Sequence, residues 1–264
     1  MSEGDHSCKL ALVTGSTSGI GLGVARELAG SGYRIMLHGL LDAGAGADLA
    51  ADFTREFAVD CGFSNADLST LRGCTELVVA TQEFGGSVDV LVNNAGIQYT
   101  SAAVDFPQAR WDSLIAVNLN APFYLSQQVL PAMLAVGWGR IINIASVHGL
   151  VASNKKAAYC AAKHGLVGLT KVLALESAKA GVTVNAICPG WVETPLIEPQ
   201  IQAIAQAQGI DIERAKMALV GEKQPLPVAT QPAAIGQLVV FLLSDAAATM
   251  TGIALPVDGG WTAQ

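Results

Sequence analysis

Tyr159 and Lys163 stand four residues apart in the stretch SVHGLVASNKKAAYCAAKHG, residues 146–165. Residues four apart lie on one face of a helix, and the small side chains around them are typical of a close-packed helix. A free tyrosine has a pKa of about 10 and is a poor base at neutral pH. A neighbouring lysine cation stabilises the phenolate, so this pair could take a proton from an alcohol while Ser146 donates a hydrogen bond to the same oxygen. The alternative is a Tyr–Lys pair on a solvent-exposed helix face.

A second chemical signal is the stretch TGSTSGIG, residues 14–21, which contains Gly15, Gly19 and Gly21. Glycine permits a tight turn and lets backbone amides approach a pyrophosphate at the N-terminus of a helix. The spacing is G-x-x-x-G-x-G, whereas the general dinucleotide fingerprint is G-x-G-x-x-G. The stretch favours a dinucleotide site, and a simple glycine-bearing turn is the alternative.

These residues need elements that carry them to one place, and the chain alternates short apolar runs with longer helical patterns. We predict strands at 9–14, 33–38, 88–93, 139–145, 182–188 and 253–258, with a weaker strand at 59–63. We predict helices at 20–29, 108–135 and 156–179. Continuous apolar strands separated by helices indicate a parallel sheet covered on both faces. The predicted fold class is a doubly wound α/β fold, with residues 1–264 forming a single dinucleotide-binding and catalytic domain.

Glycine or a polar group follows each of the main predicted strands. Besides TGSTSGIG, these stretches are NNAGIQ (93–98), SVHG (146–149) and PGWVET (189–194). Ligands in open α/β sheets bind beyond the carboxyl ends of the strands, so we expect these stretches to surround one site. The long segment 191–237 has no predicted strand and could form a small helical lid over the ligand.

Composition limits the partners of this protein. The 264 residues are 51% hydrophobic and 14% charged, and the mean hydropathy is +0.42. So little charge predicts a surface that is partly covered by other subunits. The net charge of −7, without a basic run, disfavours nucleic acid or an anionic membrane as a partner.

Cysteine usage and the N-terminal sequence predict a cytoplasmic protein. The cysteine count is odd and no C-x-x-C occurs, which indicates reduced thiols with neither a disulfide framework nor a zinc site. The N-terminus lacks the apolar core of a secretory signal, and no apolar run is long enough to span a bilayer. The five cysteines are Cys8, Cys61, Cys74, Cys160 and Cys188.

The segment HGLLDAG (38–44), at the end of the second strand, bears on the choice of cofactor. An acidic residue there favours NAD, and an arginine favours the additional phosphate of NADP. Arg55 is the first basic side chain after this strand, Gly39 and Leu40 offer nothing to a phosphate, and Asp42 comes slightly late for the ribose. We therefore predict NAD. Asp67 could touch the adenine edge or could cap the following helix.

The order and spacing of TGSTSGIG, NNAG, VNLN, Ser146, YCAAK and PG resemble the short-chain dehydrogenase/reductase family over essentially the whole chain. The resemblance implies a Rossmann-type fold of seven parallel strands and a homotetramer. It implies a Ser146–Tyr159–Lys163 triad, with Asn118 as a fourth member that steadies a water for proton relay and Lys163 also holding the nicotinamide ribose. The expected cofactor contacts are Gly15, Thr17, Ser18, Gly19, Ile20, Gly21, Asp67, Leu68, Asn94, Ala95, Gly96, Tyr159, Lys163, Pro189, Gly190, Val192 and Thr194.

Longer stretches such as GRIINIASVHGLVAS and NAICPGWVETPL most resemble the family members that interconvert D-3-hydroxybutyrate and acetoacetate with NAD. Lys156 would supply the positive charge that a substrate carboxylate needs, three residues before Tyr159. Taken singly, Lys156, His148, Gln98 and Gln200 are better explained as ordinary loop or surface side chains, and only their convergence with the resemblance favours a site. A slip of one residue would exchange Lys155 and Lys156. The resemblance implies a small substrate pocket formed by Gln98, Ser146, His148, Lys156, Tyr159, Trp191 and Gln200, with Trp261 as a further wall.

Two other functions stay open at this point. One is a reductase of 3-oxoacyl thioesters or sugars, whose substrates lack the free carboxylate. The other is a non-catalytic dinucleotide-binding sensor, which would be expected to have lost Tyr159, Lys163 or Ser146. The sequence contains no ligand cluster that demands a metal.

Overall fold

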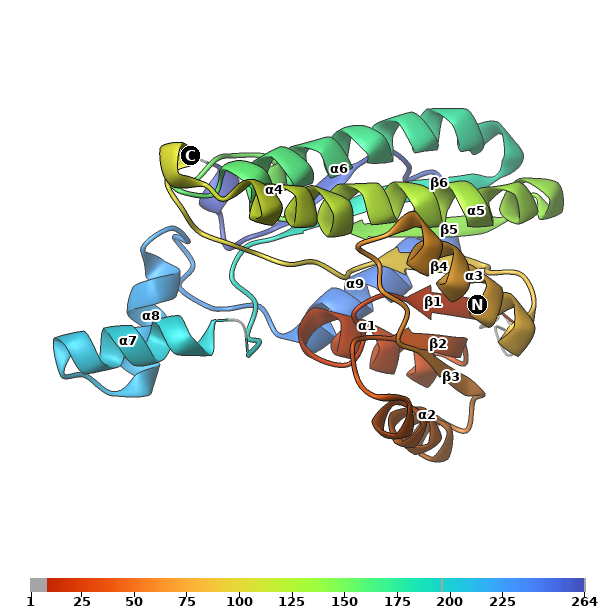
Figure 1. Cartoon of the computed structure of the whole chain (residues 1–264), viewed down its shortest axis with the longest axis horizontal. Coiled ribbons are helices and arrows are strands. Elements are labelled where there is room, and N and C mark those ends of the chain that lie inside the picture. The colour runs from red at the N-terminus through yellow and green to blue at the C-terminus, as the bar shows by residue number, and fades with distance from the viewer. Residues whose placement is uncertain (1–8, 196, 264) are drawn as a thin grey trace.

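The computed structural model describes residues 9–195 and 197–263, and its centre is a seven-stranded parallel sheet (Figure 1). Each predicted strand is confirmed to within two residues of its predicted bounds. The order across the sheet is β3-β2-β1-β4-β5-β6-β7. The strands are β1 (Leu10–Val13), β2 (Arg34–His38), β3 (Cys61–Ser64), β4 (Val90–Asn93), β5 (Gly139–Ile144), β6 (Val182–Pro189) and β7 (Ala254–Val257).

Helices cover both faces of the sheet, as Figure 1 shows. One face carries α1 (Gly19–Gly30), α2 (Ala43–Phe57) and α9 (Pro232–Leu243), and the other carries α3 (Leu71–Gly85), α5 (Ala121–Val136) and α6 (Ala157–Ser177). Along β1, Ala11 and Val13 pack into one buried layer and Leu12 into the other. Successive side chains point to opposite faces of the sheet, and both faces are buried. Every residue of the strand is therefore apolar.

The strand order reverses beside β1. The chain passes from β1 outward to β2 and β3, then returns to β4 on the other side of β1. Connections from β1 and β4 therefore leave on opposite sides of the sheet and open a crevice at the carboxyl ends of these strands, where ligands bind in such folds.

The helix predicted at 108–135 is interrupted at Asn118. The structure divides it into α4 (Gln108–Ile115), a π-helical turn (Ala116–Asn120) and α5. Pro122 has no N–H to donate to the carbonyl four residues earlier, which is that of Asn118. The backbone ladder widens there, and the N–H of Ala121 donates to the carbonyl of Ala116.

A helical lobe, residues 191–195 and 197–231, extends beyond one end of the sheet (Figure 1). It contains α7 (Glu198–Gln208) and α8 (Ile212–Gly221), which bury an apolar cluster of their own. A short parallel bridge closes its base, with Thr230 donating to Trp191 and Glu193 donating to Thr230, each at 2.9 Å. Residues 232–237, which the sequence analysis grouped with this segment, instead begin α9 and pack against α1.

No helix within residues 9–195 and 197–263 is both long enough and apolar enough to cross a membrane. Cys61, Cys74, Cys160 and Cys188 are free thiols, and Cys8 lies outside the described residues.

Candidate active site

Two connected hollows lie at the carboxyl ends of the strands. The larger is a cleft of about 690 Å³ over the ends of β1, β2 and β4. The smaller is a pocket of about 120 Å³ between the ends of β5 and β6 and the helical lobe. Five residues line both hollows: Ile20, Gln98, Ala145, Tyr159 and Thr194. A ligand in the cleft would therefore touch a ligand in the pocket near Tyr159.

The glycine-bearing loop after β1 borders the cleft. Gly15 and Gly19 have φ angles of +63° and +53°, and a Cβ on Gly15 would lie 2.9 Å from the Cα of Ala95. Ser18 is the N-cap of α1, but its side chain makes no capping bond and the first turn contains no acidic residue. The first amides of α1 therefore offer their N–H groups and the positive end of the helix dipole to an anion.

Gly21 supports this loop from beneath and does not line the cleft, although it is a predicted cofactor contact. A Cβ on Gly21 would collide with the carbonyl oxygen of Gly15 and with the Asn94 side chain. Asn94 Nδ2 donates to the carbonyls of Thr14 at 2.9 Å and Gly15 at 3.0 Å. Thr14 Oγ1 in turn accepts from the N–H groups of Asn94 and Ala95. These bonds join the loops after β1 and β4 into one rigid floor.

The far end of the cleft is formed by residues after β2 and β3. The Asp67 carboxylate accepts from the N–H of Ser69 at 2.9 Å and from its hydroxyl at 2.8 Å, and these bonds lower the pKa of Asp67. Thr70, not Asp67, caps α3 by accepting from the N–H of Gly73 at 3.0 Å. The sequence left two roles open for Asp67, a helix cap or a cleft contact. The residue that caps the helix is Thr70, and Asp67 lines the cleft.

The residues that follow β2 place no basic side chain at the cleft, and Gly39 has no room for a side chain. A Cβ on Gly39 would lie 2.5 Å from Thr17 Cγ2 in the glycine-bearing loop. Leu40 lines the cleft and is exposed. Asp42 caps α2 by accepting from the N–H of Ala45 at 3.0 Å.

The size of the cleft, its glycine cradle and the free amides at the start of α1 fit a nicotinamide dinucleotide. Ser18, Gly19 and Ile20 would hold the pyrophosphate through their backbone, and Lys163 with Tyr159 would hold the nicotinamide ribose at the other end. Within the described part of the chain, no group of three or more histidine, cysteine or acidic side chains could hold a metal ion.

The predicted triad comes together at the junction of the two hollows. Ser146 follows β5, and its hydroxyl acts on Tyr159 of α6 by lowering the pKa of the phenol. Lys163, one turn further along α6, lies with Nζ 5.7 Å from the centre of the Tyr159 ring. Lys163 Nζ also donates to the carbonyl of Ile144 at 2.8 Å, which fixes the ammonium under the cleft.

Asn118 lies behind this group and lines neither hollow. It is buried, its Oδ1 accepts from the N–H of Ile97, and its Nδ2 donates to the carbonyl of Ile97, both at 2.8 Å. Both ends of the amide are thus committed to the loop that carries Gln98. Nδ2 keeps a second N–H and Oδ1 keeps a second lone pair, so the role of Asn118 in steadying a water stays a prediction.

Burial controls the pKa values of the Tyr–Lys pair. It raises the pKa of Tyr159 above its usual value, and the Ser146 hydrogen bond opposes this only in part. Burial also lowers the pKa of Lys163 to about 8. Burial therefore favours the protonated phenol at neutral pH, and the expectation that Lys163 stabilises the phenolate stays a prediction.

His148 adds a hydrogen-bonded side chain next to Ser146. Its Nε2 lies 2.7 Å from Ser153 Oγ, its Nδ1 lies 3.3 Å from Ser146 Oγ, and its N–H donates to Ser146 Oγ at 3.1 Å. Burial, reinforced by the charge of Lys156, lowers the pKa of His148 to about 4, so the ring is neutral at pH 7. Its ring packs edge-on against Tyr159 and Trp261.

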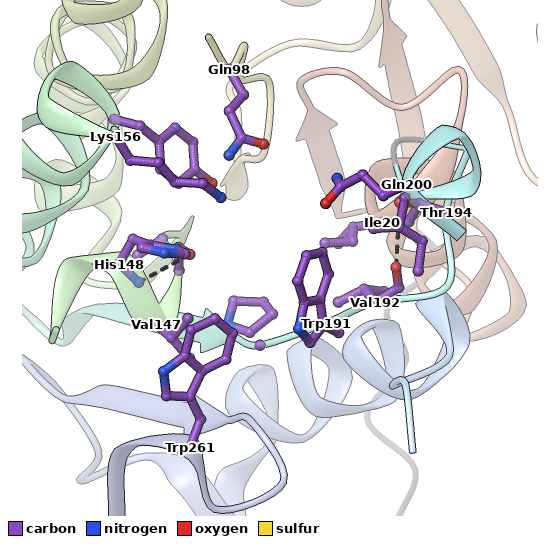
Figure 2. Close-up of a pocket in the computed structure, with 16 residues that line it drawn as sticks. Ile20, Gln98, Val147, His148, Lys156, Trp191, Val192, Thr194, Gln200 and Trp261 are labelled. Atoms are coloured by element: carbon purple, nitrogen blue, oxygen red, sulfur yellow. Dashed lines mark hydrogen bonds between the residues drawn. The ribbon is translucent and has the colours of Figure 1, made fainter. Parts of the chain in front are cut away.

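The smaller pocket collects the remaining predicted substrate contacts, as Figure 2 shows. Gln98 and Gln200 approach from opposite sides, with their amide groups towards the space between them. Trp191 and Trp261 form a wall, with ring centres 6.3 Å apart. Lys156 lines the pocket, and burial lowers its pKa.

Lys155 is distinguished clearly from Lys156. It is exposed, has a left-handed backbone with φ +63°, and does not line the pocket. Its carbonyl accepts from the N–H of Ser101 at 3.0 Å. The lysine that faces the pocket is therefore the one that the sequence analysis chose.

The predicted residues divide between the two hollows in a simple way. Every predicted substrate contact, and Trp261, lines the smaller pocket. The predicted cofactor contacts line the cleft apart from Gly21 and three residues, Pro189, Gly190 and Val192, which line the smaller pocket. Two polar residues were missed, His38 at the cleft and Ser153 beside His148. A polar residue that ends an apolar strand was the available signal for His38, and none marked Ser153.

Comparison with known protein families gives one match that covers most of the chain. The model described as short chain dehydrogenase matches residues 9–204. Among curated proteins, a D-beta-hydroxybutyrate dehydrogenase of Cupriavidus necator is 51% identical over 256 residues, covering 97% of this chain and 98% of the relative. A D-beta-hydroxybutyrate dehydrogenase of Rhizobium meliloti is 44% identical over 263 residues, covering 97% and 99%.

Solved structures show the same fold. The L-sorbose reductase of Gluconobacter frateurii, in complex with NADPH and L-sorbose, matches with a TM-score of 0.93 and 29% identity, and covers all of both chains. An actinorhodin polyketide ketoreductase with NADPH matches with a TM-score of 0.88 and 38% identity, over 97% of this chain and 98% of that one.

Proposed function

The chain belongs to the short-chain dehydrogenase family, and we propose that it is an NAD-dependent enzyme that interconverts D-3-hydroxybutyrate and acetoacetate. The relatives from Cupriavidus necator and Rhizobium meliloti, both D-beta-hydroxybutyrate dehydrogenases, support this activity over nearly the full length of the chain. The observation that carries the proposal is the presence of Lys156, Gln98 and Gln200 in the same small pocket as Tyr159.

The pocket suits a short acid. A carboxylate that leaves water needs charge-assisted donors, and Lys156 provides the charge while Gln98 and Gln200 provide amide N–H groups. The volume of about 120 Å³ and the wall formed by Trp191 and Trp261 suit a small acid better than the bulky end of a thioester. The carboxylate end would lie near Lys156 and the reacting oxygen near Ser146 and Tyr159.

The chain supplies the proton chemistry of the reaction. When bound, the nicotinamide dinucleotide supplies the hydride acceptor for oxidation of the alcohol and the hydride donor for reduction of the ketone. Ser146 donates to the reacting oxygen, and Tyr159 gives that oxygen a proton in reduction or takes its proton in oxidation. Because burial keeps Tyr159 protonated at neutral pH, reduction has its acid ready, and the rate of oxidation should rise as the pH increases.

The preference for NAD rests on the residues after β2. An additional ribose phosphate would have no cationic partner among Gly39, Leu40 and Asp42, so it would gain no charge-assisted hydrogen bond there. The close approach of Gly39 to Thr17 also resists introduction of a larger residue there. Steady-state kinetics with both cofactors tests this preference, and a higher kcat/KM with NADP would contradict it.

The substrate is tested by comparing D-3-hydroxybutyrate with its methyl ester in the parent and in Lys156→Ala. The parent should strongly prefer the acid. Lys156→Ala should lose about 10- to 150-fold in kcat/KM for the acid, since charge-assisted hydrogen bonds are the stronger kind, and should lose little for the ester. Lys155→Ala is the matched control and should behave as the parent does.

Equal turnover of acid and ester by the parent would show that the carboxylate is not recognised. A reductase of 3-oxoacyl thioesters or sugars would then take the place of the hydroxy-acid enzyme. Absence of turnover with every alcohol and ketone offered, together with tight NAD binding, would instead favour a dinucleotide-binding sensor.

A further inference from the structure

His38, the last residue of β2, is buried with 3% of its surface exposed, and both of its ring nitrogens are hydrogen-bonded to backbone. Nδ1 lies 3.1 Å from the N–H of Gly15, and Nε2 lies 2.9 Å from the carbonyl oxygen of Ala66. A peptide N–H can only donate and a carbonyl can only accept. The ring is therefore neutral, with its proton on Nε2.

The backbone of His38 is also held by the glycine-bearing loop. The N–H of Ser16 donates to the carbonyl of His38 at 2.8 Å, and the N–H of His38 donates to Ser16 Oγ at 2.9 Å. His38 thus ties residues 15 and 16 to residue 66. The residues that follow directly in each of the two loops line the cleft. They are Thr17 to Gly19 after residue 16, and Asp67 and Leu68 after residue 66.

We propose that His38 is a positioning residue for the dinucleotide: its neutral ring holds the phosphate-binding and adenosine-binding loops in register, and protonation of the ring weakens cofactor binding. A proton on Nδ1 would point at the N–H of Gly15, so two donors would face each other and the loop would have to move. The inference rests on the dinucleotide cleft of the proposed function and does not depend on the substrate.

The surroundings of the ring support a neutral histidine at pH 7. Residues 14–19 contain no ionisable side chain. On the other two sides, the Asp67 carboxylate bonds to Ser69 and the Asp42 carboxylate caps α2, so neither engages the ring. Burial lowers the pKa of His38, and the hydrogen bond to Ala66 opposes this in part.

The test measures binding of ADP-ribose by calorimetry between pH 8 and pH 5.5, since the pyrophosphate of this probe keeps the same charge across the range. The variants are His38→Asn and His38→Phe. Asparagine keeps an acceptor near the position of Nδ1 that takes up no proton in this range, but it is too short to reach Ala66. Phenylalanine keeps the ring shape and loses both bonds.

At pH 8, His38→Phe should bind ADP-ribose about tenfold more weakly than the parent, and His38→Asn should stay within about threefold. On acidification to pH 5.5 the affinity of the parent should fall at least about threefold, while that of His38→Asn should stay constant. His164→Asn, which replaces an exposed histidine on α6, is the control and should keep the pH dependence of the parent.

Two results would overturn the proposal. One is parent-like binding by His38→Phe at pH 8, and the other is a loss of affinity on acidification in His38→Asn as large as in the parent. Thermal unfolding of each variant at each pH separates loss of folding from loss of binding. If ADP-ribose does not bind the folded parent at any pH, the cofactor assignment in the proposed function fails, which is a different outcome from a flat pH profile.

Discussion

At the scale of single residues, Tyr159 is the group to which the chemistry is assigned. Tyr159→Phe removes the acid/base and should lower kcat by about 10²- to 10⁴-fold. NADH binding should be nearly unchanged, because Lys163 keeps its bond to the Ile144 carbonyl. Lys163→Ala should lose both activity and NADH affinity. Fluorescence titration with NADH beside steady-state kinetics separates the two variants, and activity of Tyr159→Phe within a few-fold of the parent would remove Tyr159 from this role.

Ser153 can select the tautomer of His148, the histidine whose ring contacts Ser146. If its hydroxyl donates to Nε2 of His148, the proton of the ring lies on Nδ1 and points to Ser146 Oγ. Ser146 Oγ then accepts from both the N–H and the ring of His148, so its own proton is left for the substrate oxygen. Ser153→Ala would release this tautomer and should lower kcat by about 10-fold. Ser153→Thr retains the hydroxyl and should restore most of the rate, and equal rates for Ala and parent would contradict this order of hydrogen bonds.

His148 also links stability to pH. A histidine in the unfolded chain titrates at about 6.5, whereas burial lowers the pKa of folded His148 to about 4. Between these values the unfolded state binds a proton that the folded state does not, so the free energy of unfolding falls as the pH drops from 6.5 towards 4. The full shift corresponds to about 3 kcal/mol. Urea unfolding of His148→Gln should show a flatter pH dependence than the parent, and an equally steep dependence in the variant would contradict this assignment.

At the scale of elements, Gln224 joins the two ends of the helical lobe to each other. It is buried, its Oε1 accepts from the N–H of Trp191 at 2.6 Å, and its Nε2 donates to the carbonyl of Val228 at 3.1 Å. One side chain thus holds the start and the end of the lobe, and Trp191 walls the substrate pocket. The position of α7, which carries Gln200, therefore depends on Gln224.

Gln224→Ala should raise KM for the hydroxy acid several-fold more than it changes kcat. The variant leaves a buried N–H without an acceptor, which costs about 1–3 kcal/mol, and this loosens the wall of the pocket. Gln231→Ala is the control: it removes an exposed bond to Glu193 and should change KM little. Steady-state kinetics of both variants decides the point, and equal KM values would argue against anchoring by Gln224.

The elements also show what a sequence can and cannot reveal. The strands were predictable because both faces of the sheet are buried, which leaves an apolar run for each strand. The break at Ala116–Asn120 was not predicted, since the helical pattern continues through it and a proline alone does not mark a break: Pro131 lies within α5. Tyr159 and Lys163 could be paired from their spacing on one helix. The roles of His38 and Ser153 depend on which groups other loops turn towards them, and no local spacing contains that information.

At the scale of the whole molecule, α5 and α6 lie side by side on one face of the sheet (Figure 1), and both carry exposed apolar side chains. Exposed apolar groups that cluster in this way are typical of protein interfaces. The low charge of the chain agrees with a surface that is partly covered. The side chains concerned are Phe123, Leu134 and Val136 on α5 and Val172 and Leu175 on α6.

We expect the protein to form a homotetramer in which this face is a subunit contact. Leu175 is 82% exposed in the single chain, so Leu175→Arg adds a charge that the isolated subunit tolerates and that a self-complementary apolar contact does not. Because a symmetric contact brings copies of the same patch together, the substitution also sets like charges against each other.

Light scattering on a sizing column should show a tetramer for the parent and a smaller species for Leu175→Arg. Val104, which is 92% exposed in the 3₁₀ turn Ala103–Asp105 outside α5 and α6, provides the control, and Val104→Arg should keep the parent mass. A parent that elutes as a monomer, or a Leu175→Arg variant that remains a tetramer, would show that the exposed apolar face of α5 and α6 is not the contact.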